Sequence, residues 1–286
     1  MEDNTDLQCC VTQCERPLNA DYWDSQYKAN ITGWDLGQAS PPIKNYIDTL
    51  QNKDAAILIP GCGNAYELEY LLSKGFTNLT VIDIAPTLVE NLQQKFKDNT
   101  NIKIVLGDFF AYNGNYDIII EQTFFCALPP SMRQQYVNKM HQLLNDDGLL
   151  VGLLFNRRFD AGPPFGGSIT EYEMLFNHAF HINKIENCQT SVTPRSNTEL
   201  FFEFKKNSEV LVNLYDFEGF TCSGCVTTVS QKYNAIPDVL NVSVSTNYSE
   251  ILLVSRKAIL LEQLQNEIAY DAKYTIKKNN INNEFN

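Results

Sequence analysis

The chain has 286 residues, 44% of them hydrophobic, with 14 Tyr and 17 Phe. This composition is sufficient for a packed core and excludes an intrinsically disordered protein. The formal net charge is -12, from 22 Lys and Arg against 34 Asp and Glu, which argues against nucleic acid or any other polyanion as a partner.

The first residues, MEDNTDLQCC, are acidic and lack the basic region and apolar run of a signal peptide. No apolar stretch approaches the length of a membrane span. We therefore expect a soluble, cytoplasmic protein that binds no membrane; its oligomeric state stays open. In a reducing compartment, cysteines more often bind metal or carry out redox chemistry than form disulfides. Cys9, Cys10 and Cys14 lie in residues 1–19, which we interpret as a flexible terminus, with a second soft-metal site as the alternative.

From residue 55 onward, short apolar runs alternate with helical patterns, as a parallel sheet with crossover helices requires. The pattern predicts strands at 55–60, 79–83, 102–106, 116–121 and 149–155, and helices at 65–75, 86–97 and 131–144. A Gly/Pro loop at 161–168 precedes a predicted helix over 170–180 and a closing hairpin formed by 182–192 and 198–206. Residues 20–207 are thus predicted to form a doubly wound α/β domain.

The turn Pro60-Gly61-Cys62-Gly63 follows the first predicted strand, where glycines let the backbone approach a ligand. Glycine also suits any tight strand-to-helix turn. Asp83 ends the second strand 20 positions after Gly63, where a carboxylate can accept hydrogen bonds from a ribose diol. Tyr66 replaces the third glycine of a dinucleotide fingerprint, which makes an NAD-dependent oxidoreductase the weaker alternative. Asp108 follows the third strand and can accept from an adenine amino group or cap a turn.

Several short motifs then occur in a characteristic order: Tyr22-Trp23, Gly33-Trp34-Asp35, Pro60-Gly61-Cys62-Gly63, Asp83, Asp108-Phe109, Phe124-Phe125-Cys126-Ala127-Leu128, Met132-Arg133 and Gly162-Pro163-Pro164. In these motifs, residues 20–206 resemble the thiopurine methyltransferase superfamily, and the plant halide/thiol methyltransferases look most similar. The resemblance implies a seven-stranded class I methyltransferase sheet and an S-adenosylmethionine-dependent methyltransferase.

Position by position, the resemblance also implies a set of cofactor-binding residues. It places Trp23, Tyr27 and Trp34 over the cofactor, Gly61 and Gly63 in the turn at its amino-acid part, Asp83 at the ribose, Asp108 and Phe109 at the adenine, and Gln122 beside the site. Ring faces attract cations and the cofactor sulfur is positive, so aromatic residues also make physical sense there. The alternative for the tryptophans is packing of an N-terminal lid. Tyr27 stands where relatives often have Trp, and Gln122 where the halide group tends to have Tyr, which affects the expected acceptor.

Arg133 matches an arginine that faces the substrate in thiopurine methyltransferases, and a guanidinium can hold an anionic acceptor. The alternative is a solvent-exposed residue in the first turn of a helix. Phe124, Phe125 and the loop 162–164 are expected to form a small apolar acceptor pocket. A thiolate or halide needs little or no general base, so no Ser-His-Asp arrangement is expected.

A polar break at 205–208 precedes a second predicted unit, 208–278, and a tail, 279–286. Strands at 210–217, 239–245, 250–255 and 273–278 and helices at 225–235 and 258–270 have the β-α-β-β-α-β order of a ferredoxin-like fold. Cys222 and Cys225 lie on one loop near a helix N-terminus, which favours thiolates and therefore soft ions such as Cu(I) or Hg(II).

This second unit resembles a heavy-metal-associated domain, whose loop usually reads Gly-Met-Thr-Cys-x-x-Cys; Phe220 replaces the Met. A thioredoxin-like redox pair is the alternative, although the strand order does not suit that fold. The sequence as a whole predicts a methyltransferase for small soft nucleophiles with a soft-metal-binding module, and this combination suggests a role in detoxification. The rival hypothesis is a metal carrier or sensor with a catalytically idle methyltransferase-like domain.

Overall fold

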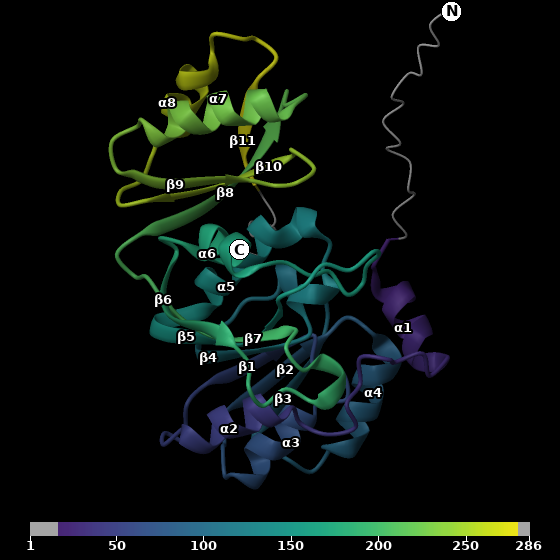
Figure 1. Cartoon of the computed structure of the whole chain (residues 1–286). Coiled ribbons are helices and arrows are strands. Elements are labelled where there is room, and N and C mark those ends of the chain that lie inside the picture. The colour runs from purple at the N-terminus through teal and green to yellow at the C-terminus, as the bar shows by residue number, and fades with distance from the viewer. Residues whose placement is uncertain (1–16, 280–286) are drawn as a thin grey trace, which may run out of the picture.

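A computed structural model describes residues 17–279 of the chain. Two β-sheets, one of seven strands and one of four, lie one above the other with helices between them (Figure 1). Cys9, Cys10 and Cys14, and all of the predicted tail except Asn279, lie outside the described residues. Among the described residues, no helix is both long enough and apolar enough to cross a membrane.

The seven-stranded sheet has the order β3-β2-β1-β4-β5-β7-β6. Strands β1 to β5 pair with one another in parallel, whereas β7 runs antiparallel to both β5 and β6. This agrees with the predicted doubly wound sheet and its closing hairpin. The strands are β1 (Ile57–Pro60), β2 (Leu79–Asp83), β3 (Ile102–Leu106), β4 (Tyr116–Gln122), β5 (Leu144–Phe155), β6 (Phe180–Asn187) and β7 (Glu199–Lys206). The strand order reverses between β1 and β4, and in such sheets ligands bind at the carboxyl ends of these strands.

Helices cover both faces of this sheet. Alternate residues of β1 face opposite layers: Ile57 and Ile59 pack with α2, α3 and α4, and Leu58 belongs to the core under α5 and α6. The helices are α1 (Ala20–Lys28), α2 (Pro41–Thr49), α3 (Tyr66–Ser73), α4 (Pro86–Lys95), α5 (Arg133–Leu143) and α6 (Ile169–Phe176). The sequence pattern did not predict α1 and α2, although each has a start signal: Asn19 caps α1, and two prolines open α2.

The predicted helix over 170–180 is wrong at its C-terminal end. Helix α6 ends at Phe176, because the Asn177 side chain accepts a hydrogen bond from the His178 N–H at 2.9 Å, and His178 adopts a φ of +64°. The chain turns there, and Phe180 begins β6. Strand β5 also begins earlier than predicted, at Leu144, directly after α5.

The four-stranded sheet is antiparallel, with the order β11-β8-β10-β9. Its elements follow the chain in the predicted β-α-β-β-α-β order, and α7 and α8 pack on one face around Val229 and Leu264. The elements are β8 (Leu211–Glu218), α7 (Ser223–Asn234), β9 (Val239–Val244), β10 (Glu250–Ser255), α8 (Leu261–Ile268) and β11 (Thr275–Lys278).

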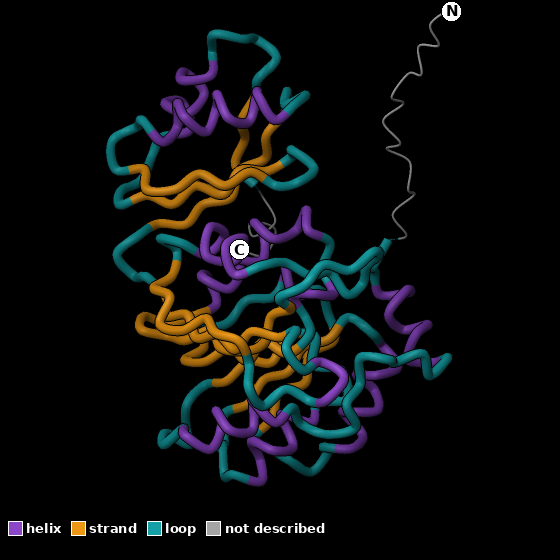
Figure 2. The backbone as a smooth tube through the Cα atoms, viewed as in Figure 1, coloured by secondary structure: helices purple, strands orange, loops and turns teal. Residues whose placement is uncertain are grey.

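The other face of the four-stranded sheet is covered by the first unit. Leu214, Leu252 and Val254 belong to the same core cluster as Tyr136 and Met140 of α5. Figure 2 shows α5 and α6 as a helical layer between the two sheets. The C-terminal unit is thus packed on the rest of the chain and not merely tethered to it.

Candidate functional site

A cavity of about 800 Å³ lies at the carboxyl ends of β1 to β4. Its walls come from α1 and the loop after it, from the turns after these four strands, and from the Gly/Pro loop. All the residues that the sequence analysis predicts to bind the cofactor line it: Trp23, Tyr27, Trp34, Gly61, Gly63, Asp83, Asp108, Phe109 and Gln122. The fold therefore brings together residues that lie far apart in the chain, from Trp23 to Gln122.

The turn after β1 requires glycine at Gly61. This residue has a φ of +54°, and a Cβ added to it would lie 2.3 Å from Cδ2 of Phe124. Gly63 also has a positive φ, +52°, and its N–H donates to Oδ2 of Asp83 at 3.1 Å. A side chain at Gly61 would therefore both strain the backbone and displace a wall of the cavity.

Asp83 is buried, with 8% of its surface exposed. Burial raises the pKa of its carboxyl group, and hydrogen bonds from the N–H groups of Ala85 and Gly63 oppose that rise. Oδ1 accepts from Ala85 at 3.0 Å and Oδ2 from Gly63. Because an ionised carboxylate offers roughly four lone-pair sites, Asp83 can still accept hydrogen bonds from a ligand.

Asp108 lines the same part of the cavity and also caps a turn. Its Oδ1 accepts from the Phe110 N–H at 2.9 Å, at the start of the short 3-10 helix Phe109–Ala111. The cap uses one oxygen, so the second oxygen is available to a ligand. Phe109 meets the ring of Phe124 edge to face, with 5.0 Å between the ring centroids.

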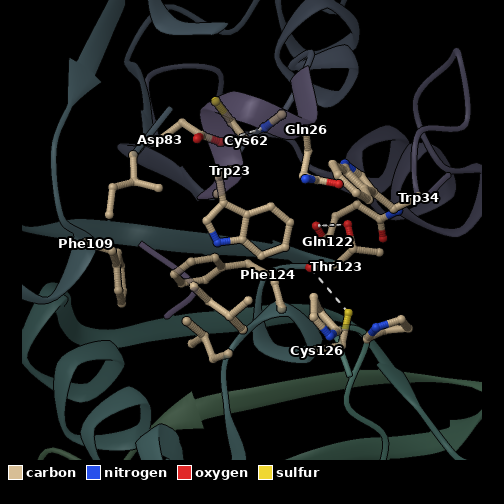
Figure 3. Close-up of a pocket in the computed structure, with 18 of the residues that line it drawn as sticks. Trp23, Gln26, Trp34, Cys62, Asp83, Phe109, Gln122, Thr123, Phe124 and Cys126 are labelled. Carbon is tan, nitrogen blue, oxygen red and sulfur yellow. Dashed lines mark hydrogen bonds between the residues drawn. The ribbon is translucent and has the colours of Figure 1, made fainter. Parts of the chain in front are cut away.

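Aromatic side chains from the N-terminal segment cover the cavity. The rings of Trp23 and Trp34 meet edge to face at 5.4 Å, and those of Tyr27 and Trp34 at 5.9 Å. In the view of Figure 3, the indole of Trp23 lies between Asp83 and Phe109 on one side and Gln122 on the other. The lid packing that the sequence left as an alternative is thus present, and the same rings line the cavity.

Two carboxylates hold this lid against the starts of α3 and α4. Oδ1 of Asp24, in α1, accepts from the Thr87 N–H at 2.7 Å at the start of α4. Asp35 accepts from the side-chain amide of Asn64 and from the Tyr66 hydroxyl, the latter at 3.3 Å. These contacts join the lid to the starts of α3, which follows β1, and of α4, which follows β2.

The turn after β4 depends on Glu121, which the sequence analysis missed. Glu121 is fully buried; its Oε1 accepts from the N–H groups of Phe124 and Phe125 at 2.8 and 2.9 Å, and its Oε2 from the Tyr136 hydroxyl at 2.6 Å. Burial raises the pKa of this carboxyl group to about 7. These bonds hold Thr123 at a φ of +62°, which is strained for a β-branched residue. An acid at the end of an apolar strand was the available signal.

The part of the cavity near β4 and β5 is more apolar. Its walls include Cys126, Leu128, Pro129, Met132, Phe155, Pro163 and Pro164. Phe124 and the Pro163-Pro164 segment line the cavity as expected, but the prediction for Phe125 is wrong. That ring is buried in the core, where it packs against Tyr136 and Phe176.

Arg133 does not line the cavity, contrary to the expectation that it faces the acceptor. Its Nη2 donates to the Gly166 carbonyl at 2.6 Å, and its guanidinium lies over the Phe125 ring at 5.1 Å. Burial lowers the pKa of Arg133. It is not the solvated residue of the alternative prediction either, because it holds the Gly/Pro loop.

Arg195 provides the cation that Arg133 was expected to supply. It is the one positively charged residue among the described residues that line the cavity. It is buried, with its Nη2 donating to the Trp34 carbonyl at 2.7 Å and its Nη1 3.4 Å from Oε1 of Glu199. The sequence carried no signal for it, because Arg195 ends a single-turn 3-10 helix, Thr193–Arg195, in the connection before β7.

Acid–base and thiol groups in the cavity are few. Burial raises the pKa values of Cys62 and Cys126, which keeps both thiols neutral. None of the described cavity-lining residues is a histidine, and His141 instead bonds to the Asn207 carbonyl at 3.1 Å.

The second candidate site is the loop before α7. The Sγ atoms of Cys222 and Cys225 lie 3.4 Å apart, and the Thr221 hydroxyl lies 3.5 Å from Sγ of Cys225. Hydrogen bonds, chiefly from Thr221 and then from Tyr274, lower the pKa of Cys225 to about 6. Within residues 17–279 no cluster of three or more His, Cys, Asp or Glu side chains could hold a metal ion, so the loop offers a pair of sulfur ligands.

Comparison with known proteins finds a matching family and similar relatives. Residues 18–213 match the family model described as thiopurine S-methyltransferase. A probable thiol methyltransferase 2 of Arabidopsis thaliana is 32% identical over 194 residues, covering 65% of this chain and 85% of the relative. Thiocyanate methyltransferase 1 of Brassica oleracea is 28% identical over 191 residues, covering 64% and 84%.

Among solved structures, 1,6-didemethyltoxoflavin-N1-methyltransferase of Burkholderia thailandensis is similar with a TM-score of 0.54 and 17% identity, covering 66% of this chain and 87% of that one. That crystal structure contains 1,6-didemethyltoxoflavin and S-adenosylhomocysteine. At this level of identity the likeness concerns the fold of the seven-stranded unit.

Proposed function

Because the chain belongs to the thiopurine S-methyltransferase family, and is thus an S-adenosylmethionine-dependent methyltransferase, we propose that its acceptors are small soft nucleophiles. Thiols and hydrogen sulfide come first, followed by selenium or tellurium species and halides. The observation that carries this proposal is the division of one cavity into a polar part with Asp83 and Asp108 and an apolar part with one cation, Arg195. The names of the thiol and thiocyanate methyltransferase relatives support the same acceptor class.

The residues of the polar part fit S-adenosylmethionine. Asp83 has acceptor capacity left for a ribose diol, and Asp108 has an oxygen left for an adenine amino group. At Gly61 the backbone approaches the cavity where a Cβ would collide with Phe124. The rings of Trp23 and Trp34 suit a positive sulfonium. When bound, this cofactor supplies an electrophilic methyl group to an in-line nucleophile.

The apolar part is then the acceptor side. Phe155, Pro163 and Pro164 exclude water from the nucleophile, which strengthens the field of nearby charges. Arg195 attracts an anionic acceptor and favours the thiolate over the thiol without acting as a base. No residue needs to take a proton from an acceptor that enters as an anion, which fits the absence of histidine among the described lining residues.

Methyl transfer from labelled S-adenosylmethionine to a panel of thiols, sulfide, selenite and iodide tests this proposal. We expect methylated products from at least the thiols or sulfide. Absence of methylated product from every acceptor would overturn the proposal and would agree with a catalytically idle domain.

The two arginines can be distinguished by matched variants. Arg195→Gln is expected to raise KM for anionic acceptors more than KM for uncharged acceptors, because it removes the positive charge from the cavity wall. Arg133→Gln removes the contact with Gly166. It should raise KM for charged and uncharged acceptors by a similar factor. If Arg133→Gln instead affected only anionic acceptors and Arg195→Gln affected all acceptors alike, Arg133 would have the acceptor-binding role predicted from the sequence.

For the C-terminal unit we propose a soft-metal site at Cys222 and Cys225 on a ferredoxin-like, heavy-metal-associated domain. The short distance between the two sulfurs and the lowered pKa of Cys225 support a pair of thiolate ligands for Cu(I) or Hg(II). The order β11-β8-β10-β9 supports the fold assignment. Joined to methylation of soft nucleophiles, such a module suggests a role in detoxification.

A Cu(I) competition assay tests this site. The double variant Cys222→Ser with Cys225→Ser should lose Cu(I) binding and keep its methyl-transfer rate, because the loop lies outside the cavity. A matched Cys188→Ser variant, which removes a buried thiol, should retain the metal. Equal Cu(I) binding by the double variant and the wild type would show that the loop is not the site.

A further inference from the structure

The four-stranded sheet packs on the helix that leads away from the acceptor side of the cavity. This sheet lies almost wholly beyond residues 18–213, which match the family model. Helix α5 contacts β8 and β10 on one side and supplies Tyr136 and Met140 to the core above the seven-stranded sheet. It is therefore enclosed by both units along its length.

The first turn of α5 is bonded directly to the four-stranded sheet. Nε2 of Gln134 donates to the Ser243 hydroxyl at 2.9 Å and to the Val244 carbonyl at 3.1 Å, and Gln134 is only 5% exposed. Nε2 of Gln135 donates to Oε1 of Glu250 at 2.6 Å. Buried hydrogen bonds of this kind are directional, and loss of one partner leaves a desolvated polar group.

The same turn reaches the wall of the cavity on its other side. Met132, the residue before α5, lines the cavity together with Pro129. Arg133 donates to the Gly166 carbonyl and so holds the loop that carries Pro164. Three consecutive residues, 132–134, thus join the cavity wall, the Gly/Pro loop and the four-stranded sheet.

We propose that the four-stranded sheet is a positioning element for the acceptor side of the cavity, acting through Gln134. The sheet fixes the start of α5, and thereby the place of Met132 and of the loop held by Arg133. This inference rests on the proposed function, which assigns that side of the cavity to the acceptor. Gln134 touches neither ligand and is a positioning residue.

A selective effect on the acceptor follows from this arrangement. The polar part of the cavity is built by the turns after β1, β2 and β3. Helix α5 packs against the short 3-10 helix that follows β3, Phe109–Ala111, whereas Gly61 and Asp83 come from the turns after β1 and β2. A small displacement of a wall can reduce turnover strongly when it disturbs the alignment of reacting groups. Loosening the start of α5 should therefore weaken binding of the acceptor more than binding of the cofactor.

The test uses the full chain with Gln134→Ala and a matched control, Gln231→Ala, an exposed glutamine on the outer helix α7. For Gln134→Ala we expect KM for the acceptor to rise by roughly three- to tenfold, the effect of losing about one hydrogen bond. The dissociation constant of S-adenosylmethionine should stay within about twofold of the wild type. Gln231→Ala should change neither. An unchanged acceptor KM, or a parallel loss of cofactor affinity, would overturn the proposal.

Hydrogen exchange provides a second readout that is independent of turnover. In Gln134→Ala, peptides covering 124–133 and 157–168 should exchange faster, while those covering 57–66 and 79–90 should not change. If this variant does not fold, Ser243→Ala removes the partner from the other side of the contact and should give the same pattern at smaller amplitude. If the wild type methylates no soft nucleophile, the proposed function fails, and the exchange pattern alone decides the positioning role; a uniform change would refute it.

Discussion

At the scale of single residues, Gly61 links the backbone of the first turn to the shape of the cavity. Gly61→Ala should lose about 1–2 kcal/mol of stability from its left-handed conformation, and most of its activity because the new Cβ displaces Phe124. Gly75 is a matched control: it has a φ of +83°, with nothing within 4 Å of an added Cβ. Chemical denaturation and turnover should show similar strain in both variants and loss of activity only at Gly61. Equal loss of activity in both would mean that contact with Phe124 is unimportant.

The buried Glu121 should make the stability of the protein depend on pH. Its pKa rises from 4.5 to about 7 because the carboxyl group is buried, so the folded state holds the proton more tightly than the unfolded state does. The stability from this group is complete below pH 4.5 and is lost as the pH rises to about 7, with a contribution on the order of 3 kcal/mol.

Glu121→Gln keeps the acceptor for the N–H groups of Phe124 and Phe125 and does not titrate. The difference in free energy of unfolding between this variant and the wild type should therefore shift in favour of the variant as the pH rises from 5 to about 7. Above that pH the difference should stay constant. Urea denaturation at several pH values measures this difference. A difference that does not vary with pH would show that Glu121 stays in one protonation state.

At the scale of elements, α1 works as a cover because Asp24 binds the start of α4. The helix carries Trp23 and Tyr27 into the cavity wall, and its contact with Thr87 is a charge-assisted hydrogen bond. Asp24→Ala should raise the dissociation constant of S-adenosylmethionine several-fold in calorimetry. The control is Lys28→Gln, which removes only the exposed partner of Asp24 and should have little effect. Equal affinities for Asp24→Ala and wild type would show that α1 is held by other contacts.

At the scale of the whole molecule, the two sheets share one core and should unfold together. Leu252 of β10 is 1% exposed and packs in the cluster that contains Tyr136. Leu252→Ala should cost about 2–5 kcal/mol and lower the midpoint of one calorimetric transition, and S-adenosylmethionine should raise that same midpoint. Two separate transitions would show that the units unfold independently, if Leu252→Ala lowered only one midpoint and S-adenosylmethionine raised only the other.

The sequence by itself determined the alternation of strands and helices, because buried parallel strands need continuous apolar runs and crossover helices need period-3.6 patterns. It also located the glycine turn, Asp83 and Asp108, since each lies at or just after the end of a strand that is visible in the sequence. The short helices α1 and α2 were missed, because their nine residues each carry only a local start signal.

Only the tertiary structure decided which side chains face the cavity. Phe124 and Phe125 are neighbours in the chain, yet one lines the cavity and the other lies in the core, because Glu121 fixes the turn that contains them. Arg133, which was expected at the acceptor, lies outside the cavity, and Arg195, for which nothing was predicted, lines it; their partners, Gly166 and Trp34, come from distant segments. The packing of the second sheet on α5 is likewise a long-range contact, and no local pattern encodes the partner of a buried face.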